Sequence, residues 1–291
     1  MGLERQERQV SKPRQRRVAL VVGSGGLKCV AALGLWRVLT REGIDIDLAV
    51  GCSGGSIYVS MMTLGWSLER AIETTHELWR DRFRRRNRGA LLKLLLPRLF
   101  GFDRAFALID DRAVNEAVHT TFGNRRIEEA ASPLFIVATD FTSGDRVVLS
   151  SGPVWEAVRA SIAIPLMLKP WEIAGRCLVD GGMSDPLPVD VAIREGVDVI
   201  IAMGFEGATF QELDAPGKLI LQTSTLAMNH LLRSSFAFYN LAHHAEVIPI
   251  IPSFDCRVGL GDTHLIPYLI EEGERAAERE VPYLRRLLGS V

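Results

Sequence analysis

Two short apolar runs near the N-terminus each end in a glycine-rich turn, and this repeated pattern restricts the chain to few kinds of fold. The first run, 17–23, leads into the turn 23–28, and the second, 48–50, leads into the turn 51–55. Apolar residues at three- and four-residue spacing follow each turn and predict helices. Strand, tight turn and helix in this repeated order are typical of a layered α/β domain with a largely parallel central sheet.

The rest of the chain continues the alternation of strand and helix signals. Helices are predicted over 56–64 and 68–79, and a long one over about 219–245. Further strands are predicted at 134–139, 146–149, 177–179, 197–203 and 247–251, and a C-terminal helix begins near residue 265. Residues 1–16 are polar and charged without periodicity, so we expect a flexible basic tail followed by a single domain over 17–291.

The composition excludes several classes of protein. Apolar residues make up 47% of the 291 residues, which is enough for a sizeable core. Lys plus Arg number 34 and Asp plus Glu 35, so no chain-wide basic field exists to bind nucleic acid. No apolar stretch approaches the roughly 20 residues that span a bilayer. The four cysteines form no CxxC pair, so we expect no metal site and no cofactor. The apolar run 18–22 is too short for a secretion signal, so we expect a cytoplasmic protein.

The turn 51–55 has the pattern GxSxG and places Ser53 between an apolar strand and a helix. A nucleophilic serine needs such a turn, because small flanking residues let the backbone bend sharply and leave the hydroxyl accessible. The following helix N-terminus favours negative charge that develops during a reaction. An ordinary glycine-rich turn is the competing interpretation of this short pattern.

The turn 23–28 also follows a strand and opens a helix. Its backbone N–H groups can point at an anion, which is either a phosphate or the oxyanion of an acyl transfer. A dinucleotide fingerprint is excluded because Lys28 occupies its last glycine position, and the pattern of a phosphate-binding P-loop is absent. An oxyanion hole remains, with Lys28 either as a nearby cation or as a solvated helix residue.

A base for the serine is the next requirement, and none of the six histidines has a diagnostic setting. A carboxylate is the natural substitute. The best candidate is Asp180, which ends an apolar run and precedes Gly181 and Gly182. Strand ends gather at one edge of an open α/β sheet, so this position predicts a carboxylate beside the serine turn. An ordinary Asp-Gly turn is the competing interpretation, and Asp185 and Asp190 are nearby alternatives.

In order and spacing, the glycine loop, the GxSxG turn and the Asp-Gly-Gly segment resemble the patatin-like phospholipase family. The segments 160–165 and 180–189 are also similar to those that flank the family's motifs, and the likeness covers about residues 17–204. The resemblance implies a three-layer modified α/β-hydrolase fold. It also implies a Ser-Asp dyad that cleaves fatty-acyl esters of phospholipids without calcium.

Carried over to this sequence, the resemblance implies that Ser53 is the nucleophile, Asp180 the base, and Gly25 and Gly26 the oxyanion-hole donors. The supporting residues it implies are Lys28, Gly51, Gly54, Gly55, Gly181 and Gly182. The sequence departs from the family pattern at two small residues. Ser24 replaces the first glycine of the usual triplet, and Cys29 stands where a glycine normally follows the basic residue. The loop should still close, but the set of donors is open.

The stretch Arg80–Arg104 is both basic and apolar. It contains nine arginines and lysines against two aspartates, interleaved with leucines and phenylalanines. Such a stretch can contact anionic headgroups while its apolar side chains enter the interface, which predicts peripheral membrane contact. A charged helix face whose leucines pack inward is the alternative. Nucleic acid is a poorer partner, because leucines rather than stacking aromatics accompany the charges.

Together these features predict a serine lipid acyl hydrolase of the phospholipase A or lysophospholipase type that acts through an acyl-enzyme. Two other functions stay open. One is an esterase, thioesterase or acyltransferase that uses the same dyad on soluble acyl esters. The other is a non-catalytic lipid-binding module. The head group and the oligomeric state are not encoded in any recognisable pattern.

Overall fold

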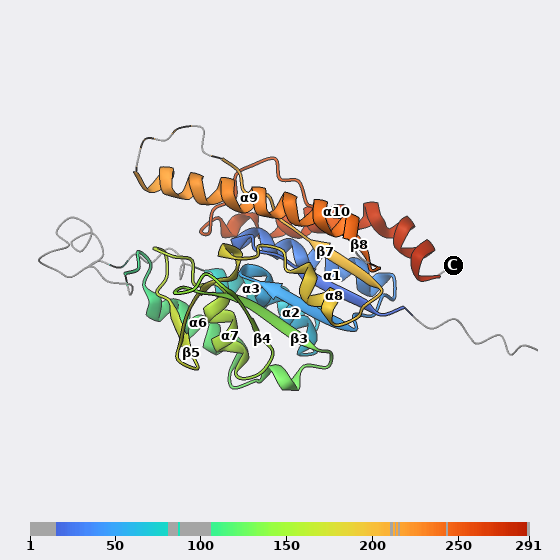
Figure 1. Cartoon of the computed structure of the whole chain (residues 1–291), viewed down its shortest axis with the longest axis horizontal. Coiled ribbons are helices and arrows are strands. Elements are labelled where there is room, and N and C mark those ends of the chain that lie inside the picture. Colours follow the sequence, from blue (N-terminus) through green and yellow to red (C-terminus); the bar gives the residue numbers. More distant parts are fainter. Residues whose placement is uncertain are drawn as a thin grey trace, which may run out of the picture.

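The structure is a computed structural model of the chain, and it describes residues 16–80, 87, 106–209, 212, 214, 216–242 and 244–289. These residues form a central sheet of eight strands, seven of them in the order β5-β6-β3-β2-β1-β7-β8, with β4 paired to β3 (Figure 1). The strands are β1 (Val18–Val22), β2 (Leu48–Cys52), β3 (Leu134–Asp140), β4 (Arg146–Leu149), β5 (Trp171–Ile173), β6 (Arg176–Asp180), β7 (Val199–Met203) and β8 (Glu246–Ile250).

Five of the strands make the parallel part of the sheet. β1 pairs in parallel with β2 and β7, β2 with β3, and β7 with β8, whereas β4, β5 and β6 form antiparallel pairs. Val22 is in register with Gly51 of β2 and with Met203 of β7, so these strands end together. We call this the carboxyl edge of the sheet. The sheet is largely parallel, as predicted.

The central strands β1, β2 and β7 are apolar and buried throughout, because both faces of the sheet are covered there. In β1, Val18, Leu20 and Val22 belong to the core on one face, and Ala19 and Val21 to the core on the other. All five are buried. A strand buried on both faces needs an unbroken apolar run rather than alternation, which is why the sequence pattern identified it.

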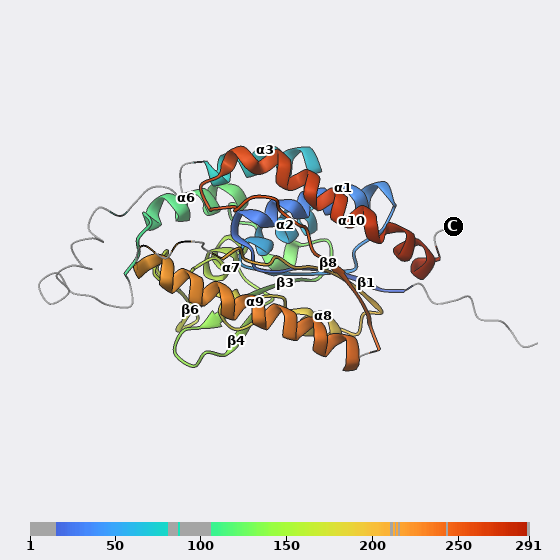
Figure 2. The ribbon, with the colours of Figure 1, turned by 90° about the horizontal axis from the view of Figure 1, so that it is seen from above.

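Helices form a layer on each side of the sheet (Figure 2). The first layer contains α1 (Ala31–Arg41), α2 (Gly54–Thr63), α3 (Leu68–Trp79), α6 (Asp111–Phe122), α7 (Val154–Ser161) and α10 (Ile266–Leu288). The second layer contains α8 (Val189–Arg194) and α9 (Pro216–Ala242). Short 3₁₀ segments are η1 (Gly26–Val30), η3 (Ile127–Glu129), η4 (Gly181–Met183) and η5 (Thr263–Leu265). The predicted three-layer α/β fold is therefore confirmed.

Helices α1 and α10, the first and last along the chain, cross with their backbones in contact. A Cβ atom added at Gly34 would lie 2.0 Å from the carbonyl oxygen of Ile270, and one at Gly273 would lie 1.9 Å from that of Ala31. Only glycine leaves room for such an approach. Arg37 of α1 also pairs with Glu274 of α10 at 2.7 Å, which ties the C-terminal helix to the first strand-helix unit.

Most predicted elements occur close to their predicted bounds, and 68–79 and 146–149 match them fully. The helix after the serine turn begins at Gly54, two residues earlier than predicted, because both glycines of the turn already have helical geometry. The sequence did not define α6 or the three-residue strand β5. Among the helices that the structure describes, none has the length and apolar character needed to cross a membrane.

Candidate active site

Ser53 occupies the sharp turn between β2 and α2 at the carboxyl edge. Its backbone has φ 52° and ψ −129°, a left-handed conformation that costs energy for a residue other than glycine. Helix α2 begins at the next residue, so the N–H groups of its first turn surround the serine. Ser53 is 2% exposed. This is the geometry of a nucleophile elbow, with the hydroxyl held at the end of a strand.

Three glycines let this elbow close. A Cβ atom at Gly51 would lie 2.4 Å from Ser56 Cα, and one at Gly54 would lie 2.5 Å from the carbonyl oxygen of Gly26. At Gly55 it would lie 2.3 Å from the carbonyl oxygen of Val22. Each of these neighbours is backbone, which cannot swing away as a flexible side chain would. The glycines of the GxSxG turn therefore bring the elbow against β1 and the glycine loop.

Asp180 meets Ser53 although 127 residues separate them. The Ser53 hydroxyl donates to Asp180 Oδ2 at 2.5 Å, and both groups are buried. The route to this position differs from the expected one. β6 runs antiparallel to β3, enters the sheet from beyond the carboxyl edge, and stops with Asp180 beside Ala138. The preceding residue of β3, Val137, is in register with Cys52. Asp180 is therefore offset by one residue along β3 from the end of β2, where the elbow begins.

Burial controls the ionisation of Asp180. The residue is 3% exposed, and this burial raises the pKa of its carboxyl from 3.8 to about 6. Hydrogen bonds from the Ser53 hydroxyl and from the Gly182 N–H, the latter at 2.8 Å to Oδ1, act in the opposite direction because they favour the carboxylate. A carboxyl group with a pKa near 6 is a stronger base than an ordinary aspartate and is still mostly ionised at neutral pH.

Gly181 and Gly182 allow the chain to turn directly after Asp180. A Cβ atom at Gly181 would lie 2.2 Å from the carbonyl oxygen of Val137, and one at Gly182 would lie 2.6 Å from Ser24 Oγ. Gly181 therefore packs directly against β3, and Gly182 packs against the glycine loop. The three sequence motifs thus pack on one another.

The two competing aspartates have a different partner. Asp185 Oδ2 accepts a hydrogen bond from Arg146 at 2.5 Å, and Asp190 Oδ2 accepts one from the same guanidinium at 2.6 Å. Neither bonds to Ser53 in the part of the chain that is described. Of the described histidines, 76, 119, 230, 244 and 264, none lines the cavities around Ser53. Asp180 is the carboxylate that the fold brings to the serine.

The glycine loop places two amide groups at the same cavity. Ser24 N donates to the carbonyl oxygen of Pro186 at 2.8 Å, whereas the N–H groups of Gly25 and Gly26 make no hydrogen bond within the described residues. Gly26 has φ +57°, and a Cβ atom at Gly25 would lie 2.6 Å from the Phe205 ring. Glycine is therefore required at both positions, and both residues line the cavity that contains Ser53.

Lys28 and Cys29, which follow the glycines of this loop, each contact a backbone carbonyl oxygen. Lys28 Nζ donates to the carbonyl oxygen of Glu206 at 2.6 Å, and burial lowers the pKa of its ammonium group. Cys29 is fully buried, its Sγ lies 3.4 Å from the carbonyl oxygen of Gly23, and it packs beside Gly54. The departure from the family pattern at Cys29 is thus accommodated beneath the loop. Within the described residues, no cluster of three or more His, Cys, Asp or Glu side chains could hold a metal.

Ser161 is a member of the site that the sequence reasoning missed. Its Oγ accepts a hydrogen bond from Ser53 N at 2.8 Å and donates to the carbonyl oxygen of Val137 at 2.6 Å. The residue ends α7, within the segment 160–165 that resembles the family. Nothing in the local pattern distinguishes this hydroxyl from others, because its partners are backbone atoms of two distant segments, the serine turn and β3.

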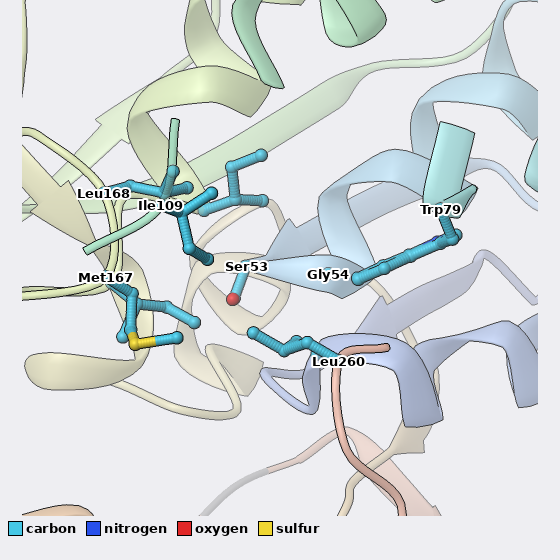
Figure 3. A pocket seen from close by; sticks show the side chains of 10 residues that line it. Ser53, Gly54, Trp79, Ile109, Met167, Leu168 and Leu260 are labelled. Carbon is cyan, nitrogen blue, oxygen red and sulfur yellow. The ribbon is translucent and has the colours of Figure 1, made fainter. Parts of the chain in front are cut away.

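The described residues line two cavities that adjoin Ser53. The larger has a volume of about 370 Å³ and is mainly apolar, with Met167, Phe205 and Met228 among its lining residues beside Ser53 and Asp180. The smaller, of about 10 Å³, lies among Trp79, Ile109, Ile162, Ile164, Met167, Leu168 and Leu260. Figure 3 shows the Ser53 hydroxyl facing the side chains of Met167 and Leu260. The serine therefore opens into an apolar space.

A layered α/β fold with a serine elbow beside a buried aspartate defines a modified α/β-hydrolase. The chain belongs to the patatin-like phospholipase family, whose model matches residues 20–193. This range lies within the 17–204 over which the motifs showed a likeness.

Several known proteins are similar to this chain. An uncharacterised NTE family protein of Mycobacterium tuberculosis is 32% identical over 227 residues, which are 78% of this chain and 58% of that protein. Patatin-like phospholipase domain-containing protein 6 of Homo sapiens is 30% identical over 188 residues, 64% of this chain and 13% of that protein. The crystal structure of VipD from Legionella pneumophila gives a TM-score of 0.48 at 12% identity, covering 91% of this chain and 66% of VipD. The chain thus spans less than two thirds of the length of both sequence relatives.

Proposed function

We propose that this chain is a serine lipid acyl hydrolase that cleaves fatty-acyl esters of phospholipids or lysophospholipids, with Ser53 as nucleophile and Asp180 as base. The observation that carries the proposal is the 2.5 Å hydrogen bond from Ser53 to Asp180 at the floor of an apolar cavity. Membership in the patatin-like phospholipase family supports the choice of a lipid ester. The mainly apolar lining fits an acyl chain better than a polar substrate.

The first half of the reaction forms an acyl-enzyme. Asp180 Oδ2 accepts the Ser53 proton as Oγ attacks the ester carbonyl carbon. Negative charge then develops on the carbonyl oxygen, and the N–H groups of Gly25 and Gly26 stabilise it with the N-terminus of α2. Collapse of the tetrahedral intermediate breaks the ester bond, and the proton held by Asp180 passes to the leaving alcohol.

The second half releases the fatty acid. Asp180 takes a proton from a water molecule that attacks the acyl carbon, and the same N–H groups stabilise the second oxyanion. Ser53 recovers its proton when it leaves. The raised pKa of Asp180 supports both proton transfers, because a base near pKa 6 matches neutral pH better than one near 4.

Labelling with a fluorophosphonate tests this proposal directly. The parent protein should form a covalent adduct at Ser53, located by mass spectrometry, and Ser53→Ala should lose phospholipid hydrolysis by at least about 10³-fold. Ser60→Ala is a matched control, since Ser60 is also buried on α2 and its hydroxyl has no partner among the described residues. If the folded parent protein formed no adduct at Ser53, the assignment of Ser53 as the nucleophile would be wrong.

Substrate comparison separates the hydrolase of lipids from the other activities of the same dyad. Long-chain phospholipid and lysophospholipid should be turned over faster than short soluble esters and acyl thioesters at equal concentration. Preference for thioesters, or transfer of the acyl group to an added alcohol in place of water, would contradict the proposal. Binding of lipid without turnover in the parent would support a non-catalytic module instead.

The basic stretch Arg80–Arg104 lies outside the described residues except for Arg80 and Asn87. We propose that it contributes to peripheral contact with anionic membranes, because its sequence combines arginines with leucines. Replacement of Arg84, Arg85 and Arg86 by glutamate should reduce cosedimentation with anionic vesicles. Unchanged cosedimentation would contradict membrane contact and support the alternative, a charged helix face exposed to water.

A further inference from the structure

Three large apolar side chains at the mouth of the Ser53 cavity are exposed to solvent. Leu108 is 38% exposed, Leu166 is 40% exposed and Met183 is 47% exposed, and all three also line the cavity. They come from separate segments: the approach to α6, the loop after α7, and η4 directly after Asp180. The opening that leads to Ser53 is thus bordered by apolar groups from three segments. We call these three residues the apolar rim.

Leu166 is unfavourable in water for two independent reasons. Its φ is +69°, a left-handed conformation that glycine and asparagine adopt far more readily than leucine. Its side chain is also exposed, so packing does not offset this strain. A glycine or an asparagine at this position would relieve both penalties. Backbone strain that the surroundings impose on an exposed residue is characteristic of functional surfaces.

The surroundings hold Leu166 firmly. Leu108 N donates to the carbonyl oxygen of Leu166 at 2.9 Å, and Ile109 N donates to that of Met167 at 3.0 Å. These two bonds place the exposed leucines 108 and 166 side by side. The fully buried Arg159 fixes the other end of the loop by donating to the carbonyl oxygen of Lys169 at 3.0 Å. The rim is therefore presented by a constrained backbone.

We propose that the apolar rim inserts into the surface of aggregated lipid, so that an acyl chain passes from the lipid into the cavity without crossing water. This inference rests on the proposed function, because it takes the cavity to be the acyl-ester site. A protein seated on the same three side chains would cover the opening and block access to Ser53. A lipid surface covers them and supplies the ligand, which is why we choose it as the occupant.

Vesicle binding in the absence of turnover tests the rim. The Ser53→Ala protein is compared with the same protein carrying Leu108→Gln, Leu166→Asn and Met183→Gln, using phosphatidylcholine vesicles, which carry no net charge. We expect the rim variant to bind at least about tenfold more weakly, because three apolar groups lose their burial in lipid. Val148→Gln, at an equally exposed valine (39%) of β4 outside the cavity, should bind like the parent.

Thermal unfolding shows whether lost binding reflects lost structure. Leu166→Asn alone should keep or raise the melting temperature, since asparagine tolerates the left-handed backbone, while still weakening binding. Unchanged binding in the rim variant, or an equal loss in Val148→Gln, would overturn the inference. Vesicle binding is measured without catalysis, whereas the fluorophosphonate adduct tests whether Ser53 is a nucleophile. The two experiments therefore distinguish an error in the inferred role of the rim from an error in the proposed function.

Discussion

The backbone N–H of Ser53 donates to the side-chain hydroxyl of Ser161 at 2.8 Å, and the same hydroxyl donates to the carbonyl oxygen of Val137 at 2.6 Å. The C-terminus of α7 therefore connects the elbow to β3. This bond satisfies a buried N–H group in a turn whose φ of 52° is unfavourable. It also commits Ser53 N to Ser161, so in the proposed mechanism the N–H groups that stabilise the oxyanion come from the glycine loop and the start of α2.

Removal of this hydroxyl should affect both stability and turnover. We expect Ser161→Ala to lower the free energy of unfolding by about 1 to 3 kcal/mol, because it leaves the Ser53 N–H unsatisfied. Turnover of a soluble ester should fall by at least about tenfold as the serine leaves its position beside Asp180. Denaturant unfolding and steady-state kinetics measure the two effects. Ser60→Ala, which removes a buried hydroxyl with no partner among the described residues, should leave turnover unchanged and should not lower the free energy of unfolding.

The pH dependence of activity should follow Asp180. Only the ionised carboxylate can accept the Ser53 proton, and burial raises its pKa to about 6. We therefore expect kcat/KM for a soluble ester to rise through a midpoint near pH 6 and to level off above pH 7. A profile that is flat from pH 5 to 8, or a midpoint at the ordinary value near 4, would contradict this assignment.

The same pKa shift predicts that Asp180 destabilises the fold at neutral pH. The folded protein holds the proton more tightly than the unfolded chain, so unfolding becomes easier as pH rises from about 4 to 6. Asp180→Asn removes this effect and keeps an acceptor for Gly182 N–H. We expect the variant to be more stable than the parent by up to about 3 kcal/mol at pH 8, with little difference near pH 4. Denaturant titrations at both pH values provide the measurement, and lower stability at pH 8 would refute it.

The crossing of α1 and α10 should tolerate no side chain at its two glycines. Gly273→Ala places a Cβ atom 1.9 Å from the carbonyl oxygen of Ala31, so the helices must separate. We expect the free energy of unfolding to fall by about 2 to 3 kcal/mol, and Gly34→Ala should act in the same direction. Arg279→Ala, at an exposed position of α10, is the control and should change stability little. If Gly273→Ala and Arg279→Ala changed the free energy of unfolding equally, the close contact between the helices would not contribute to stability.

Local signals predicted most of the secondary structure because their causes are local. Helix α3 has its predicted bounds, and Ser67 caps its N-terminus by accepting from Arg70 N at 3.2 Å. The central parallel strands β1, β2 and β7 were identified because burial on both faces demands unbroken apolar runs. β5, with three residues, is too short to carry a periodic signal, and α6 lies between 80 and 134, where the local pattern predicted no defined helix or strand.

The partners of the site were harder to predict because they depend on distant contacts. Asp180, Asp185 and Asp190 lie within eleven residues of one another, and the sequence favoured the first without excluding the others. Arg146 on β4 distinguishes the three, because it forms ion pairs with Asp185 and Asp190. Asp180 instead accepts the hydrogen bond from Ser53. The antiparallel direction of β6 was likewise not visible, because strand direction depends on pairing with β3.

The sequence by itself determined the layered fold and the short motifs, because a glycine turn between a strand and a helix has few alternative geometries. Only the tertiary structure decided that Asp180 Oδ2 would lie 2.5 Å from Ser53 and that Ser161 would hold the serine's N–H. It also decided that burial would raise the pKa of this carboxyl to about 6. Hydrogen bonds and desolvation act over a few ångströms in space, and the residues that supply them here are more than 100 positions apart along the chain.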